Sequence, residues 1–74
     1  MKRYSIHQAD GTLVAEVDTL QQVGDKVQPG QWSYDWITPP EVFSRYTAWR
    51  REDGTGYLVG TPCHTEEAAR LHCR

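Results

Sequence analysis

The sequence predicts a single small α+β domain. We expect an antiparallel sheet of about five strands (two β-hairpins plus a third strand), short helical turns, and a C-terminal helix packed on one face of the sheet. Three observations predict this fold. Alternating apolar and polar runs flank an Asp-Gly turn in residues 4–17, and a similar pair flanks the glycine-bearing loop at 52–56. A Thr-Glu-Glu-Ala-Ala segment from Thr65 indicates a helix start. The 74 residues suffice for one hydrophobic core and no second one.

The N-terminal hairpin is expected to turn at Asp10-Gly11, because tight hairpin turns favour this pair between alternating runs. A short helical turn should follow the hairpin. Asp18 is its expected N-cap, Gln21 stands in the capping-box position, and Gly24 is expected to end it.

A tryptophan-rich strand is expected at residues 31–37, after a type II turn at Pro29-Gly30. Its alternation places three aromatic residues on one face: Trp32, Tyr34 and Trp36. Thr38-Pro39-Pro40-Glu41 then predicts the start of a second short helix, because Thr38 can cap it and proline is tolerated in a first turn.

Residues 46–51 admit two interpretations. In the first, the helical spacing of four apolar residues extends the second helix to about Arg51. These residues are Val42, Phe43, Tyr46 and Trp49. Alternatively, residues 46–51 and 57–61 form a second hairpin around the glycine-bearing loop. We prefer the hairpin because a good strand sequence follows that loop.

The C-terminal segment is expected to be a helix capped by Thr65, after a strand that Pro62 closes. Ala68, Leu71 and His72 are expected on its inward face. If Cys63 and Cys73 both belong to this helix, ten residues separate them by about 15 Å, which is too far for a disulfide.

The sequence offers little support for catalysis. Cys63-His64 and His72-Cys73 supply four soft ligands, but they lie at opposite ends of the expected helix, so we expect no metal site. Cys63 beside His64 is a weak candidate nucleophile, since no orienting partner or oxyanion site accompanies it. We therefore expect no enzyme and no cofactor.

No apolar stretch reaches the roughly 20 residues of a membrane span, and the basic start lacks the apolar core of a signal peptide. We therefore expect a cytoplasmic protein that is a monomer or homodimer. The net charge is −2, but residues 10–41 hold six acids against one lysine, a balance of −5, and the remainder has a balance of +3. Such polarity can steer a domain onto a charged partner.

Two surfaces are candidates for partner binding. The first is the aromatic face formed by Trp32, Tyr34 and Trp36, although a chain this poor in aliphatic residues can equally need that face for its core. The second interleaves arginines with aromatic residues, as single-strand nucleic acid sites do; it consists of Arg45, Tyr46, Trp49, Arg50 and Arg51.

The sequence thus favours a small protein-binding module, an accessory or inhibitor protein that docks on a larger protein complex. Nucleic-acid binding through Arg45, Arg50 and Arg51 is the alternative, and a homodimeric structural protein is a further one. The hairpin and helix of residues 46–73, with its Thr-Glu-Glu-Ala-Ala start, broadly resembles the arm-binding domains of phage integrases. It is also similar to small phage and plasmid accessory proteins, including inhibitors of host defence such as anti-CRISPR proteins.

Overall fold

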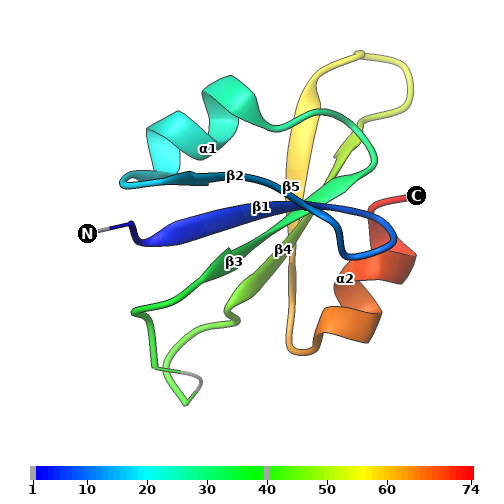
Figure 1. The fold of residues 1–74 in the computed structure, drawn as a ribbon. Coiled ribbons are helices and arrows are strands. Elements are labelled where there is room, and N and C mark those ends of the chain that lie inside the picture. Colours follow the sequence, from blue (N-terminus) through cyan, green and yellow to red (C-terminus); the bar gives the residue numbers. More distant parts are fainter. Residues whose placement is uncertain (1, 40) are drawn as a thin grey trace.

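The fold is a five-stranded antiparallel sheet with two short helices, as a computed structural model of residues 2–39 and 41–74 shows (Figure 1). The strands run in the order β2-β1-β3-β4-β5 across the sheet. In chain order the elements are β1 (Tyr4–Gln8), β2 (Leu13–Val17), α1 (Leu20–Lys26), β3 (Gln31–Asp35), β4 (Tyr46–Arg51), β5 (Leu58–Cys63) and α2 (Glu66–His72). The predicted fold class is confirmed.

The N-terminal hairpin turns at Gly11, which has a φ of 97° that few other residues adopt. Helix α1 begins one residue later than predicted. Its N-cap is Thr19, which forms a capping box with Gln22. The prediction that Gly24 ends this helix is wrong, because the helix continues to Lys26 and buries Val23 completely against the sheet.

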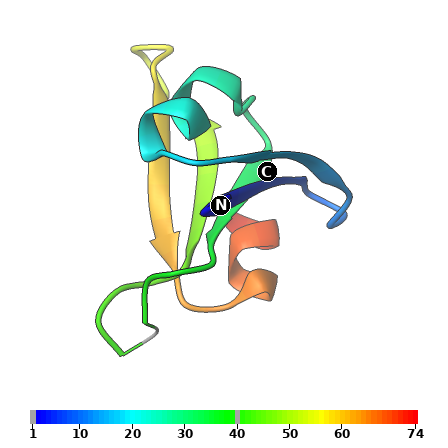
Figure 2. The ribbon, with the colours of Figure 1, turned by 60° about the vertical axis from the view of Figure 1, so that its left-hand side comes forward.

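The two helices pack on opposite faces of the sheet and toward opposite ends of it (Figure 1). Helix α1 covers a cluster formed by Ile6, Val17, Val23 and Val27. Helix α2 lies beside β4 and β5 (Figure 2) and covers a cluster formed by Trp32, Ala48, Cys63, Ala69 and Cys73. A C-terminal helix on one face is therefore confirmed.

The predicted second helix at Thr38 does not form in the described residues, where 41–45 make only turns and bends; Pro40 of the predicted start lies outside the described residues. The local polar groups explain the difference. The Asp35 carboxylate accepts from the amides of Ile37 and Thr38, which ends β3 two residues earlier than predicted. Arg45 Nε donates to the Thr38 carbonyl at 2.7 Å. This carbonyl therefore accepts from a side chain across the loop and not from a helical amide.

The second hairpin, which the sequence favoured for residues 46–51, is confirmed. The register pairs Trp32 of β3 with Ala48 of β4 and Trp49 with Gly60 of β5. A Cβ at Gly60 would meet Cγ2 of Thr47 at 2.8 Å and the Trp49 ring at 3.0 Å, which accounts for a glycine within this strand.

Strand β5 does not end at Pro62, as the sequence predicted, but continues to Cys63. Proline is tolerated here because β5 lies at the edge of the sheet, where an outward-facing nitrogen needs no hydrogen-bond partner.

The C-terminal helix has the predicted Thr65 cap, whose side chain accepts from the amide of Ala68. Of the three residues predicted on its inward face, Ala68 packs against the cluster, whereas the prediction is wrong for Leu71 and His72. Ala69 and Cys73, four residues apart, are buried, whereas Ala68 is half-buried and Leu71 is 67% exposed. His72 is exposed as well.

Cys63 belongs to β5, so the 15 Å separation expected within one helix does not apply. Cys63 and Cys73 are free thiols buried in the same cluster. Within residues 2–39 and 41–74, neither helix has the length and apolar character that a membrane span requires.

Candidate functional site

Five aromatic rings gather on the face of the sheet that α2 covers, and we call them the aromatic patch: His7, Trp32, Tyr34, Trp36 and Tyr46. The strand register explains why they share a face. His7 of β1 lies opposite Trp32 of β3, and Tyr34 lies opposite Tyr46 of β4. Directly opposed residues point to the same side of a sheet. Trp36 follows β3 and packs edge-on against Tyr34.

The rings form one continuous chain of contacts. His7 stacks on Trp32 at 4.2 Å between centroids, and Trp32 meets Tyr46 at 5.8 Å. Tyr34 lies 4.8 Å from Tyr46 and 4.7 Å from Trp36, the latter in a T-shaped pair. Trp32 is 1% exposed, Tyr46 and Tyr34 are half-buried, and Trp36 is 57% exposed. The patch therefore joins the hydrophobic core directly to the surface.

Hydrogen bonds at Ser5 fix two of the rings. The indole Nε1 of Trp36 donates to Ser5 Oγ at 3.2 Å, and Ser5 Oγ lies 2.7 Å from Nε2 of His7. Nδ1 of His7 lies 3.2 Å from the Gly11 carbonyl, which can only accept, so Nδ1 donates. In a neutral imidazole Nε2 is then the acceptor for the Ser5 hydroxyl. Trp36 is thus exposed and yet held in one orientation.

The tyrosine end of the patch is held by Arg45. Its Nη1 donates to the Tyr34 hydroxyl at 3.0 Å, and its guanidinium carbon lies 6.0 Å from the Tyr34 ring centroid. Desolvation raises the pKa of Tyr46, and the neighbouring Tyr34 and the charge of Glu66 add to this effect.

The aromatic patch encloses a shallow pocket of about 240 Å³, lined by its five rings and by Glu66. Glu66 is the first residue of α2 and pairs with Arg70 at 2.9 Å. One indole lacks a partner, since Nε1 of the buried Trp32 makes no hydrogen bond within the part of the chain that the structure describes.

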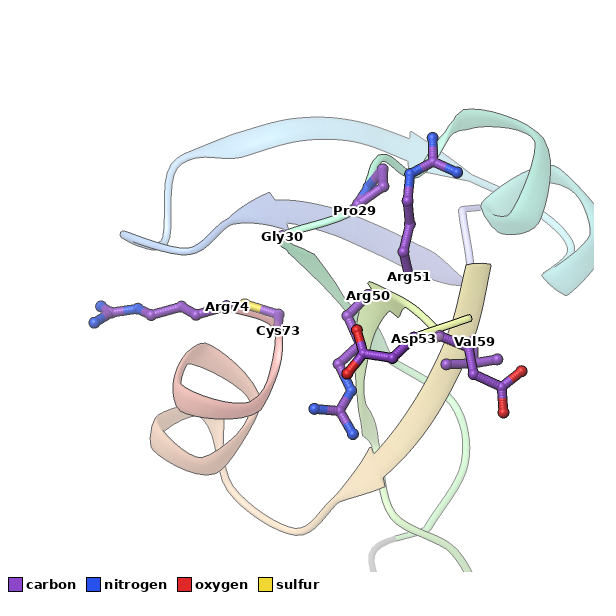
Figure 3. A pocket seen from close by; sticks show the side chains of 9 residues that line it. Pro29, Gly30, Arg50, Arg51, Asp53, Val59, Cys73 and Arg74 are labelled. Carbon is purple, nitrogen blue, oxygen red and sulfur yellow. The ribbon is translucent and has the colours of Figure 1, made fainter. Parts of the chain in front are cut away.

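A second, wider hollow of about 740 Å³ lies where the end of β4 approaches the C-terminus. Figure 3 shows Arg50 and Arg51 pointing in opposite directions, with Arg74 directed away from both. Glu52 and Asp53 also line this hollow, so its charges are mixed. Arg51 already donates to the Gly56 carbonyl at 2.7 Å. The hollow therefore presents no concentrated positive surface.

The structure brings together only some of the residues that the sequence nominated. Trp32, Tyr34 and Trp36 share one face as predicted, although Trp32 belongs to the core. The arginine and aromatic set is divided. Tyr46 belongs to the aromatic patch and Arg45 donates to the Tyr34 hydroxyl beside it, whereas Arg50 and Arg51 line the other hollow.

Trp49 lies on the opposite face of the sheet, where it packs against the cluster that α1 covers and donates to Ser33 Oγ at 3.0 Å. Sequence reasoning missed His7 and Glu66, which come from distant segments. The alternation of β1 was the available signal for His7, because it places Ser5 and His7 on the same face.

The two thiols lie in environments that disfavour the thiolate. Burial raises the pKa of Cys63 and of Cys73, whereas a nucleophilic thiol needs a lowered one. In the described part of the chain, no three His, Cys, Asp or Glu side chains are grouped so that they could hold a metal ion. Comparison with protein families, with curated proteins and with solved structures gave no significant match.

Proposed function

We propose that this protein is a non-catalytic protein-binding module that docks on a larger macromolecular complex through the aromatic patch, as an accessory or inhibitor protein would. The observation that carries the proposal is the state of Trp36. This side chain is 57% exposed, yet it is hydrogen-bonded to Ser5 and packed edge-on against Tyr34.

A rigid exposed tryptophan suits docking for an energetic reason. Tryptophan, tyrosine and arginine dominate binding hot spots, because a large ring gives much contact area for little lost conformational entropy. Trp36 is already fixed before a partner arrives, so little ordering cost remains at binding. Tyr34, which itself packs on Tyr46, contacts Trp36 and limits the motion of its ring.

The loop that follows β3 runs beyond the sheet (Figure 1), and its Phe43 lines a hollow on the opposite face together with Ser33 and Thr47. Three side chains of this loop are at least half exposed: Ile37 at 50%, Val42 at 58% and Phe43 at 69%. Exposed large apolar side chains grouped on one segment are typical of an interaction surface, whereas scattered ones need no explanation.

The test compares Trp36→Ala with Tyr57→Ala as affinity baits in lysate of the native host, with and without nuclease treatment. Tyr57 is a matched control, because it is an aromatic residue that is 73% exposed but lies outside the aromatic patch. We expect one defined protein to bind the unchanged chain and Tyr57→Ala but not Trp36→Ala. Binding of that protein should then be reproduced with the purified components by calorimetry.

Two outcomes would contradict the proposal. Equal capture by all three baits would remove the aromatic patch as the docking surface. Capture that disappears on nuclease treatment would instead favour nucleic-acid binding, which should weaken steeply with salt.

A further inference from the structure

The pocket of the aromatic patch has an unusual combination of walls. Four tryptophan and tyrosine rings, the imidazole of His7 and the carboxylate of Glu66 line it, and no lysine or arginine does so among the described residues. The faces of aromatic rings carry partial negative charge and attract cations, most strongly when the ring is an indole. Two of the five rings are indoles, and of these Trp36 is the one open to a ligand, because Trp32 is 1% exposed and stacked on His7.

The carboxylate of Glu66 remains available for a second positive group. Its ion pair with Arg70 uses Oε2, and the side chain stays 48% exposed. A carboxylate has two oxygens and about four acceptor positions, so Arg70 does not saturate it.

Arg45, the other basic residue nearby, binds the Tyr34 hydroxyl and the Thr38 carbonyl and does not line the pocket. Its guanidinium carbon lies 6.0 Å from the Tyr34 ring centroid, at the outer limit of a cation–π contact.

The size of the pocket points to a single side chain. Its volume of about 240 Å³ lies below the roughly 300–1,000 Å³ of most small-molecule sites. We infer that this pocket receives a cationic side chain of the partner protein, preferably an arginine, which stacks on the rings and pairs with Glu66. Arginine fits better than lysine, because its planar guanidinium can stack on a ring and bind a carboxylate at the same time. The inference rests on the docking function proposed above.

The test titrates the intact protein with N-acetylarginine amide and follows the indole N–H signal of Trp36 by NMR. The citrulline analogue has the same shape without the charge and serves as the ligand control. We expect a saturable shift with the arginine probe. Binding should be about tenfold weaker for the citrulline probe, as expected for loss of a partly desolvated cation–π contact and an ion pair.

Glu66→Gln should weaken binding of the arginine probe by a similar factor, whereas Glu67→Gln should leave it unchanged. The second variant is a matched control, because both glutamates lie in the first turn of α2 and interact alike with the helix dipole. Glu67 lines a different hollow. Absence of a saturable shift, equal binding of the two probes, or equal weakening by both variants would overturn the inference.

The two proposals fail separately. If Trp36→Ala abolishes partner capture but the arginine probe does not bind, the docking surface stands and the cation pocket is overturned. If the probe binds as expected but capture does not depend on Trp36, the pocket stands and the docking function is overturned.

Discussion

Asp35 anchors the loop that carries Trp36, and its replacement should measurably destabilise the fold. Arg3 donates to the two carboxylate oxygens at 3.3 and 3.2 Å, and the amides of Ile37 and Thr38 donate to Oδ1 at 2.9 and 3.2 Å. Desolvation by itself would raise the pKa of Asp35. The hydrogen bonds from Arg3, Thr38 and Ile37 outweigh it and lower this pKa from 3.8 to about 2.

The size of the effect follows from the difference in pKa between the folded and unfolded states. A decrease from 3.8 to about 2 corresponds to at most about 2.4 kcal/mol of folding free energy at neutral pH. The Arg3 side chain is 40% exposed, so solvent screens part of the ion pair. We therefore expect about 1–2 kcal/mol. Because the folded pKa is the lower one, this stabilisation is present above pH 3.8 and is lost as the pH falls through 2.

The assay is urea unfolding of the unchanged chain and of Asp35→Asn between pH 7 and pH 2. The variant should be less stable by about 1–2 kcal/mol at pH 7, equivalent to a decrease in Tm of roughly 4–15 °C for a domain of this size. The difference should shrink as the pH falls from 4 to 2. A difference that stays constant over this range, or none at pH 7, would refute the reasoning.

Asp18→Asn is the control for that experiment. Asp18 pairs with Lys2 at 3.7 Å, but both side chains are about half exposed. Surface pairs of this kind contribute roughly 0–1 kcal/mol. The control should therefore change stability less than Asp35→Asn does.

Three further predictions concern the core, the glycines and the thiols. Ile6→Ala, at a fully buried site, should cost about 2–5 kcal/mol in urea unfolding, and a cost below about 1 kcal/mol would contradict the packing. Gly24→Ala should stabilise the protein by roughly 0.5–1 kcal/mol, because the site is helical and a Cβ there meets nothing within 4 Å. Gly30→Ala should destabilise the protein by roughly 1–2 kcal/mol, because Gly30 has a φ of +90°. Stability changes of the same sign for the two glycine variants would contradict these backbone conformations. Cys63 and Cys73 should react with iodoacetamide more slowly in the native state than in urea, because burial raises their pKa values. Equal rates in the native state and in urea would contradict their burial.

Local patterns in the sequence were sufficient to predict most of the sheet. The Asp10-Gly11 turn and the alternation around it specify the first hairpin without help from distant residues. Residues 46–51 were ambiguous because Tyr46 and Trp49 suit both a helix face and a strand. The choice is made by pairing with β3, where Trp32 lies opposite Ala48, and this contact is not local in sequence.

The candidate site was less predictable, because side-chain exposure depends on where distant elements pack. Trp32 and Trp36 lie on the same face, but α2 covers the first and leaves the second exposed. Glu66 reaches the pocket only because α2 returns across β4. Alternation can assign a side chain to a face, but it cannot indicate which part of that face a later helix will cover.

Pro62 makes the two edges of the sheet differ in how readily each could pair with a further strand. Proline in β5 removes one donor from the outer row of that edge, whereas β2 at the other edge contains no proline. Head-to-tail addition of copies would need both edges, and Pro62 disfavours it. Pairing of β2 with β2 of a second copy would use one edge twice and close as a two-fold dimer. Pro62 therefore disfavours strand addition at the β5 edge, whereas no proline interrupts the donors of β2.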